Sequence, residues 1–153
     1  MAADALARLR AAIPHVQFTT DIMVGFPGET EEEFEASLDF ARRIAFARAH
    51  IFAYSRRPGT PAAAMPHQVP AAEKTARARR MSEVCETARA AYETALLGSE
   101  TSILLETSYP DGYTDGHTPT YIPVRVKTDK TSGELIRVRL TGRDKDYCVG
   151  VEV

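Results

Sequence analysis

The chain of 153 residues has only two cysteines, no tryptophan and a formal net charge of −2. Cys85 and Cys148 lie far apart and belong to no Cys/His cluster, which excludes a structural zinc site and favours buried thiols over a disulfide. The small net charge excludes a nucleic-acid footprint spread over the whole chain. No apolar run reaches the ~20 residues of a membrane span, and no signal-peptide core is present, so we expect a cytoplasmic protein.

The sequence also lacks the common catalytic patterns. Its histidines are scattered, at His15, His50, His67 and His117. No Ser-His-Asp or Cys-His arrangement accompanies them, so structural or solvated histidines are expected.

The first part of the chain alternates helix and strand patterns. Ala-rich residues 2–12 predict a helix that Pro14 ends, and apolar residues 16–24 predict a strand buried on both faces, as in a parallel sheet. A capping box, Thr30 to Glu33, precedes an apolar stripe typical of a helix over 31–45.

Residues 48–55 predict a second strand, so the first part is a βαβ unit with a right-handed crossover and a parallel sheet. Four prolines in 56–70 predict an extended loop, and 71–97 predict a long helix that Gly98 caps.

From residue 99 the period becomes strand-like. Strands are predicted at 101–107, 121–127, 134–140 and 146–153, with turns at 110–112, 114–116, 130–134 and 141–146. Five short strands in this region, one more than the four ranges just given, would fit a small closed barrel of OB-like size.

We therefore predict an α/β part followed by an all-β part, with the boundary at Gly98/Ser99. One strand–helix–strand unit cannot cover both faces of its sheet, so residues 1–98 are expected to be the end of a larger domain. On this view Met1 marks the start either of a cloned fragment or of a partial gene.

Two loops follow the predicted parallel strands at the edge where α/β folds bind ligands. Gly25 permits close backbone approach and Gly28 permits positive φ, but Glu29 and Glu31 would repel a phosphate and no Gly-Lys-Ser/Thr is present. An empty tight turn remains the alternative to a ligand site here. Arg56 and Arg57 of the second loop either hold an anion or are solvated.

Two further stretches could contact RNA. Lys74, Arg77 and Arg80 share one helix face, which is either solvated or meets phosphates. In the predicted barrel, aromatic and cationic residues interleave in the manner of stacking plus phosphate contact: Tyr113, His117, Tyr121, Arg125 and Lys127. Core packing explains part of this pattern, since period 2 sends Val124 and Val126 to the opposite face.

Together, "TTDIMVGFPGETEEEFEASLDF" (19–40), "HIFAYSRRPGTPAAAMPHQVP" (50–70), the long Arg-rich helix and the small barrel resemble the C-terminal half of a radical-SAM methylthiotransferase. The resemblance implies that residues 1–98 are the end of a radical-SAM (βα) barrel, with 71–97 as a linker helix. It implies that 99–153 are a TRAM domain holding the anticodon stem-loop of tRNA.

The same resemblance implies S-adenosylmethionine and two [4Fe–4S] clusters as cofactors of the complete enzyme. The family binds both clusters through cysteine triads in its N-terminal half, and neither Cys85 nor Cys148 matches a triad. We therefore expect the N-terminal half to be a required partner and this chain alone to be inactive.

Two sets of residues are carried over from the resemblance. The cofactor set is Ile22, Val24, Gly25, Phe52, Tyr54, Arg57 and Thr60. The RNA set is Arg77, Arg80, Tyr113, His117, Tyr121, Arg125 and Lys127.

Residues 50–62 and 113–126 favour the branch that acts on N6-threonylcarbamoyladenosine next to the anticodon. The alternatives are the N6-isopentenyladenosine branch and, third, a branch that modifies a ribosomal-protein aspartate. A different hypothesis is a non-enzymatic RNA-binding module, which would bind tRNA with an affinity that falls as salt rises.

Overall fold

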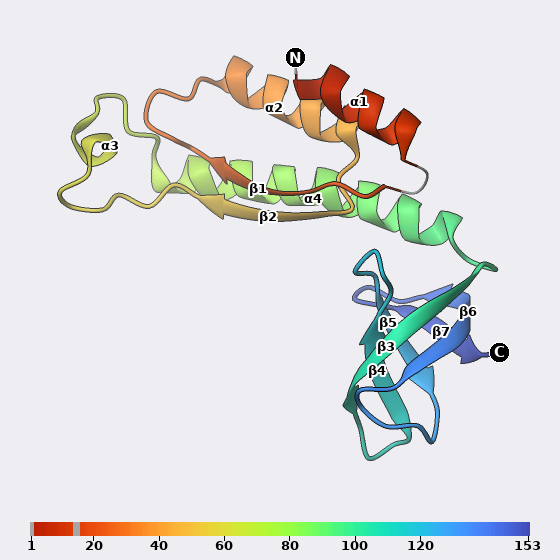
Figure 1. Cartoon of the computed structure of the whole chain (residues 1–153). Helices are drawn as coiled ribbons and strands as arrows, with labels where there is room; N and C mark the ends of the chain where they lie inside the picture. The colour runs from red at the N-terminus through yellow and green to blue at the C-terminus, as the bar shows by residue number, and fades with distance from the viewer. Residues whose placement is uncertain (1, 14–15) are drawn as a thin grey trace. The chain divides into compact units, whose positions relative to one another are not determined.

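The structure is a computed structural model that describes residues 2–13 and 16–153. Predictions for Pro14 and His15 lie outside these residues. The chain divides into two compact units, one ending at Arg89 and one from Ala90 to Val153, which are described separately. The elements of the first unit are α1 (Ala2–Ala12), β1 (Thr19–Val24), α2 (Glu31–Ile44), β2 (Arg48–Ala53), α3 (Pro61–Ala64) and most of α4 (Ala71–Ala95) (Figure 1).

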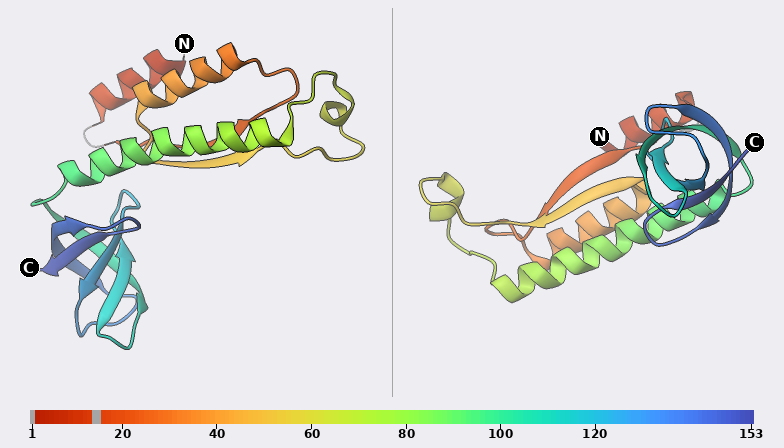
Figure 2. Two further views of the ribbon diagram at one scale, coloured as in Figure 1. Left: turned by 180° about the vertical axis from the view of Figure 1, so that it is seen from behind. Right: turned by 90° about the horizontal axis from the view of Figure 1, so that it is seen from below.

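The two strands of the first unit form a parallel pair whose register runs from Thr19↔Arg48 to Val24↔Ala53. This confirms the predicted βαβ unit, and Figure 2 shows both strands running alongside α2 and α4. A radical-SAM barrel requires more strands than these two, so that assignment stays a prediction.

One face of the strand pair is covered by helices. Val24 is buried with Phe34 and Leu38 of α2 and with Met81 and Cys85 of α4. Side chains alternate along a strand, so Ile22, two residues before Val24, packs against the same core. Apolar burial between strands and helices therefore holds the unit together.

The other face of the strand pair is open. Met23 and Phe52 are partners in the β1–β2 register, and they are 46% and 44% exposed. Asp21 and His50 are the next pair on this face and are also exposed. A strand predicted to be buried on both faces is thus buried on one only, because no described element of the first unit packs on the second.

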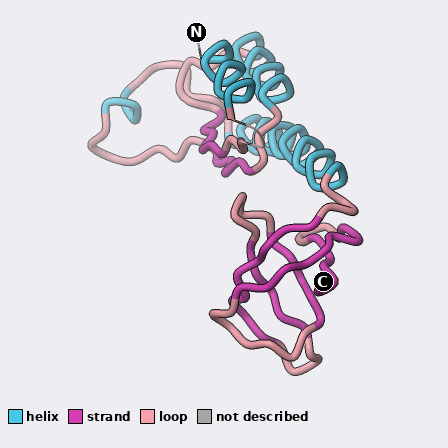
Figure 3. The backbone as a smooth tube through the Cα atoms, turned by 45° about the vertical axis from the view of Figure 1, so that its right-hand side comes forward, coloured by secondary structure: helices cyan, strands magenta, loops and turns pink. Residues whose placement is uncertain are grey.

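The composition of the proline-rich loop predicted an extended chain. The loop instead contains the one-turn helix α3, so it is not wholly extended (Figure 3). Thr60 caps this helix by accepting a hydrogen bond from the Ala63 amide at 3.3 Å, and Pro61 stands at its first position. Proline lacks the amide that would be unpaired there, so this helix start suits it.

The second unit is a closed barrel of five strands, in the order β3-β4-β5-β7-β6, attached to the end of α4. Its strands are β3 (Glu100–Ser108), β4 (Tyr113–His117), β5 (Pro123–Lys127), β6 (Leu135–Arg143) and β7 (Cys148–Glu152). The predicted five-stranded barrel is confirmed. Its sheet is mixed, because β5 and β7 run parallel while the other neighbours are antiparallel.

Alternate residues of the strands fill the barrel. The buried set is Ile103, Leu105, Ile122, Val124, Val126, Ile136, Val138, Leu140 and Cys148. Tyr92 and Leu96, at the end of α4, pack against this core, and the buried Glu93 accepts a hydrogen bond from Arg143 Nε at 2.6 Å. The last turns of α4 are thus part of the barrel unit, and the domain boundary at Gly98/Ser99 stays a prediction.

One predicted turn, residues 114–116, lies inside β4 instead. Its glycine suggested a turn, but Gly116 serves close packing. A Cβ on Gly116 would stand 2.2 Å from the carbonyl oxygen of Leu104 on the neighbouring strand β3. Glycine within a strand often marks such an approach of a second backbone.

We expect Gly116→Ala to lower the free energy of unfolding of the barrel by about 3 kcal/mol, because the clashing atom is rigid backbone. Gly142→Ala is the matched control, since its Cβ would meet only the side chain of Val149, at 3.8 Å. Urea unfolding of both variants checks this. Equal stability of the two variants would contradict the close approach.

Candidate functional site

The turn after β1 has two glycines at positive φ, Gly25 at 70° and Gly28 at 89°. The prediction for Gly28 is confirmed, and its amide donates to the carbonyl of His67 at 2.9 Å. At Gly25 the close neighbour is a side chain of this chain, because a Cβ there would lie 2.3 Å from Cγ of Lys74. The space that glycine leaves on this side is therefore filled by α4.

The acidic run begins α2 as predicted. Thr30 accepts from the Glu33 amide at 3.2 Å, and Glu33 accepts from the Thr30 amide at 2.9 Å. This confirms the capping box, which satisfies two amides that the helix itself leaves unpaired.

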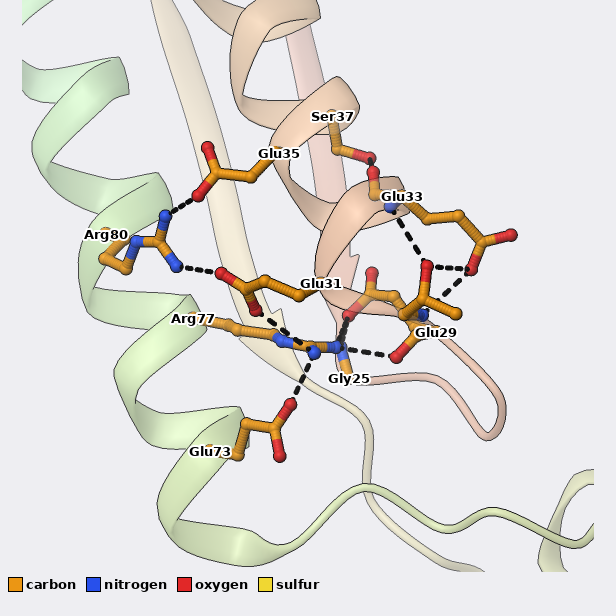
Figure 4. A network of polar contacts seen from close by, with 10 residues as sticks. Gly25, Glu29, Glu31, Glu33, Glu35, Ser37, Glu73, Arg77 and Arg80 are labelled. Atoms are coloured by element: carbon orange, nitrogen blue, oxygen red, sulfur yellow. Dashed lines mark hydrogen bonds and ion pairs between the residues drawn. The ribbon is translucent and has the colours of Figure 1, made fainter.

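The acids also bind α4, which the sequence did not predict (Figure 4). Arg77 is 2% exposed, and its NH1 group donates to the carbonyl of Glu29 at 3.0 Å and to its carboxylate at 2.7 Å. The same carboxylate accepts from the Gly25 amide at 2.7 Å. NH2 of Arg77 contacts Glu31 at 3.3 Å and also Glu73. We call Arg77 and Glu29, with the Gly25 amide, the turn clamp.

Arg80 extends this network one turn further along α4. It pairs with Glu31 at 2.6 Å and with Glu35, and its hydrogen bond lowers the pKa of Glu31. The basic face of α4 is thus packed on the turn and on α2 and is not a solvated face. We therefore leave Arg77 and Arg80 out of the proposed RNA surface, because their charges are used inside the chain.

The residues predicted to touch a cofactor divide between the two faces of the strand pair. Ile22 and Val24 point into the helix-covered core, whereas Phe52 lies on the open face. Met23 lies beside Phe52 on that face and was not among the predicted cofactor residues. The alternation of β1 could have shown this, since Met23 has the opposite parity to Val24.

Tyr54 follows β2 and is 7% exposed, with its hydroxyl buried and without a hydrogen-bond partner among the described residues. Its ring meets Phe26 of the turn edge-on, at 5.3 Å between centroids. Lys74 Nζ donates to the Tyr54 carbonyl at 2.9 Å. The structure thus brings Gly25, Phe26 and Tyr54 together at the carboxyl edge of both strands.

The remaining cofactor candidates lie in the second loop. Arg57 and Thr60 are exposed, and the Thr60 hydroxyl donates to the Arg57 carbonyl at 2.8 Å, which makes this a local turn contact. Arg56 is likewise engaged locally, donating to the Ala63 carbonyl at 2.8 Å.

On the barrel, Arg125 projects outward from β5 while Val124 and Val126 point into the core, as the period-2 pattern predicted. Its guanidinium binds both carboxylate oxygens of Asp115, at 2.7 and 2.8 Å. It also stacks on the rings of Tyr109 and Tyr147, at 5.1 and 4.3 Å from their centroids. Arg125 is thus neutralised within the barrel.

His117, Tyr121, Tyr113 and Lys127 share the outer side of the same barrel region. His117 Nδ1 lies 2.9 Å from a carboxylate oxygen of Glu106, and its ring is 6.2 Å from that of Tyr121. Tyr113 and Lys127 are partners in the β4–β5 register. Lys127 is exposed and has no ion pair within the described part of the chain.

Among residues 2–13 and 16–153, no group of three or more His, Cys, Asp or Glu side chains could hold a metal ion. Cys85 and Cys148 are both buried, in the cores of different units. The residues present therefore do not fit an iron–sulfur cluster. None of the described helices is long and apolar enough to cross a membrane.

No protein-family model matches the chain. Curated relatives do match it, and each of the three described here is named tRNA-2-methylthio-N(6)-dimethylallyladenosine synthase. The chain is 42% identical to the Moorella thermoacetica protein over 142 residues, or 90% of the chain and 32% of the relative. It is 39% identical over 145 residues to that of Mycolicibacterium vanbaalenii (88% and 28%), and 49% over 100 residues to that of Mycolicibacterium paratuberculosis (65% and 19%).

The chain spans about a third, or less, of the length of these relatives. The similarity confirms the coarser resemblance to part of a tRNA methylthiotransferase. It contradicts the predicted threonylcarbamoyladenosine branch, because the relatives are named for the dimethylallyl nucleoside. That prediction was wrong, because the sequences of the second loop and of the barrel, at 50–62 and 113–126, do not distinguish the two branches.

We expect Arg77→Ala to lower the free energy of unfolding of the first unit by about 3 kcal/mol, because it removes a buried guanidinium and leaves the partly buried Glu29 carboxylate without its cation. Arg79→Ala is the matched control, two residues away, with a side chain 74% exposed that pairs with Glu83 at 3.7 Å. It should change the stability by less than about 0.5 kcal/mol. Urea unfolding monitored by circular dichroism compares them, and equal effects would contradict the turn clamp.

The Asp115–Arg125 pair makes the barrel sensitive to acid. The hydrogen bond from Arg125 holds the pKa of Asp115 below its ordinary value of 3.8. The unfolded carboxylate therefore takes up its proton first as the pH falls, so the pair stabilises the barrel fully above about pH 5 and is lost through the folded pKa.

Unfolding midpoints of wild type and Asp115→Asn should accordingly differ most at neutral pH and converge as the pH falls through the lowered pKa of folded Asp115. Asp146→Asn, at an exposed position with no ion pair in the described residues, is the control and should leave the pH profile unchanged. A constant gap between wild type and Asp115→Asn at all pH values would overturn this account.

Proposed function

We propose that this chain is the C-terminal part of a radical-SAM tRNA methylthiotransferase that converts N6-dimethylallyladenosine in tRNA to its 2-methylthio derivative. The observation that carries the proposal is the 42% identity, over 90% of the chain, to a protein named for that product. The fold supports it, because a one-sided βαβ unit is followed by a small closed barrel.

In this proposal the open face of β1 and β2 is the inner wall of a radical-SAM barrel completed by chain outside this sequence. Met23 and Phe52 supply apolar surface there, and Phe26 and Tyr54 lie at the carboxyl edge, where α/β folds bind ligands. The adenosyl part of S-adenosylmethionine would rest on this surface. Ile22 and Val24 would support it from the covered face, and Gly25, Arg57 and Thr60 would line its rim.

The two [4Fe–4S] clusters of the complete enzyme would be held by its N-terminal half, since the residues of this chain do not fit them. When bound, the clusters supply the radical and the sulfur. The contribution of this chain is then to shape the cofactor wall and to bind the tRNA anticodon stem-loop, in the cytoplasm, through the outer barrel surface around Tyr113, His117, Tyr121 and Lys127. Arg125, whose charge Asp115 neutralises, is left out of this surface, as Arg77 and Arg80 are.

A chimaera tests the proposal. The matching segment of the Moorella thermoacetica enzyme is replaced by this chain and expressed in a bacterium deleted for its own enzyme. Mass spectrometry of tRNA nucleosides should show 2-methylthio-N6-dimethylallyladenosine. This chain expressed alone should give none, because it has no cluster ligands.

The control is a chimaera that carries Leu135→Ala, an exposed position outside both proposed sites, which should be as active as the parent chimaera. A folded, cluster-loaded chimaera that forms no methylthio product, or that methylthiolates only threonylcarbamoyladenosine, would refute the proposal.

A further inference from the structure

Among residues 2–13 and 16–153, Tyr121 is the most exposed of the large hydrophobic side chains, at 74%. Its backbone is in the left-handed region, with φ at 61°. For a bulky residue this conformation is a genuine outlier, and glycine or asparagine is usual there. A solvated aromatic ring held in an unfavourable backbone conformation is not explained by packing.

The turn around Tyr121 enforces the conformation. Thr118 is buried and accepts two hydrogen bonds from this turn. Its carbonyl accepts one from the Tyr121 amide at 2.9 Å, and its hydroxyl accepts one from the Ile122 amide at 3.0 Å. The Thr118 amide in turn donates to the Ile122 carbonyl at 3.0 Å, and Ile122 is anchored in the barrel core. The turn is therefore fixed on both sides of Tyr121. Strain sustained in this way by its surroundings points to a functional constraint.

The neighbours of Tyr121 offer ring faces and apolar surface more than free charge. The His117 ring lies 6.2 Å away, inclined at 49°, and is itself held by Glu106. Leu104, the β3 partner of His117, is 45% exposed. Arg125 pairs in register with Asp115, which lies two residues before His117 on β4. Asp115 neutralises its charge, so Arg125 is not available for a phosphate.

Among the described residues of β4 and β5, one cation on the same outer side has no ion pair. This cation is Lys127, which pairs in register with Tyr113 on β4. Tyr113 lies four residues from His117 along the same strand, a separation of roughly 13 Å at the rise of a strand. A ring surface with one cation at this distance suits a nucleotide chain, whose bases stack while a phosphate is neutralised. A protein partner would need a broader apolar surface than a single ring on a polar turn.

We propose that Tyr121 is a stacking platform for an unpaired RNA base, presented rigidly by the turn 118–122, with His117 beside it and Lys127 as the phosphate contact. This rests on the proposed function only in taking RNA as the partner. It deepens that function by naming what is recognised, an extruded or loop base in place of a helical backbone.

The absence of tryptophan makes this directly measurable. Tyr121→Trp places a sole indole at the platform. Its fluorescence should be quenched by a stem-loop RNA with an unpaired adenosine loop and not by a fully paired duplex of equal length. Equal quenching by both RNAs, or by neither, would overturn the proposal.

Substitutions separate stacking from charge. Tyr121→Leu should weaken binding of the stem-loop about 5- to 100-fold and leave the slope of log K against log salt unchanged. Tyr121→Phe should recover most of this affinity, because it keeps the ring. Lys127→Gln should instead reduce the slope by about 0.7.

Tyr121→Gly guards against misfolding. It relieves the strained backbone, so its thermal midpoint should not fall below that of wild type, although it should bind as weakly as Tyr121→Leu. Stem-loop binding by Tyr121→Leu within twofold of wild type, or no RNA binding by wild type, would refute the stacking role. The chimaera assay of tRNA nucleosides reports on the methylthiotransferase function separately, so either proposal can fail while the other stands.

Discussion

The burial of one guanidinium organises the first unit. Arg77 is only 2% exposed. A buried positive charge is tolerated only when carboxylates and carbonyls surround it. Glu29 meets this need and also holds the Gly25 amide, so the position of the turn and the position of α4 are set by the same group. The glycine at 25 is part of this arrangement, since the stem of Lys74 fills the volume that a side chain would take.

This dependence explains which features could be predicted from the sequence. Local signals were reliable: the Thr30–Glu33 capping box and the alternation of Val124 and Val126 follow from residues close together in the chain. The order of strand, helix and strand then predicted the parallel pair correctly. The contacts of Arg77 join residues 48 positions apart, and no local pattern distinguishes such an arginine from a solvated one. The same holds for Gly116, whose reason is a backbone carbonyl on another strand.

The barrel shows a similar division between local and non-local effects. The aromatic and basic residues of β4 and β5 were recognisable as a surface, but their charges were not. Asp115, predicted to lie in a turn, neutralises Arg125, and Glu106, predicted only as a strand residue, contacts His117. What remains for a partner, in the described part of β4, β5 and the turn between them, is mainly the π-face of exposed rings and the charge of Lys127. Such a surface has more specificity for shape than for net charge.

The parallel pairing of β5 with β7 has a consequence for how the barrel is made. β7 follows the other four strands in the sequence but lies between β5 and β6 in the ring. Until residues 148–152 leave the ribosome, β5 and β6 each present an unpaired edge, and an unpaired strand edge is a template for pairing with other chains. Closure of the barrel therefore waits for the last of its own five strands, and until then the nascent chain must be protected from pairing with other chains through these open edges.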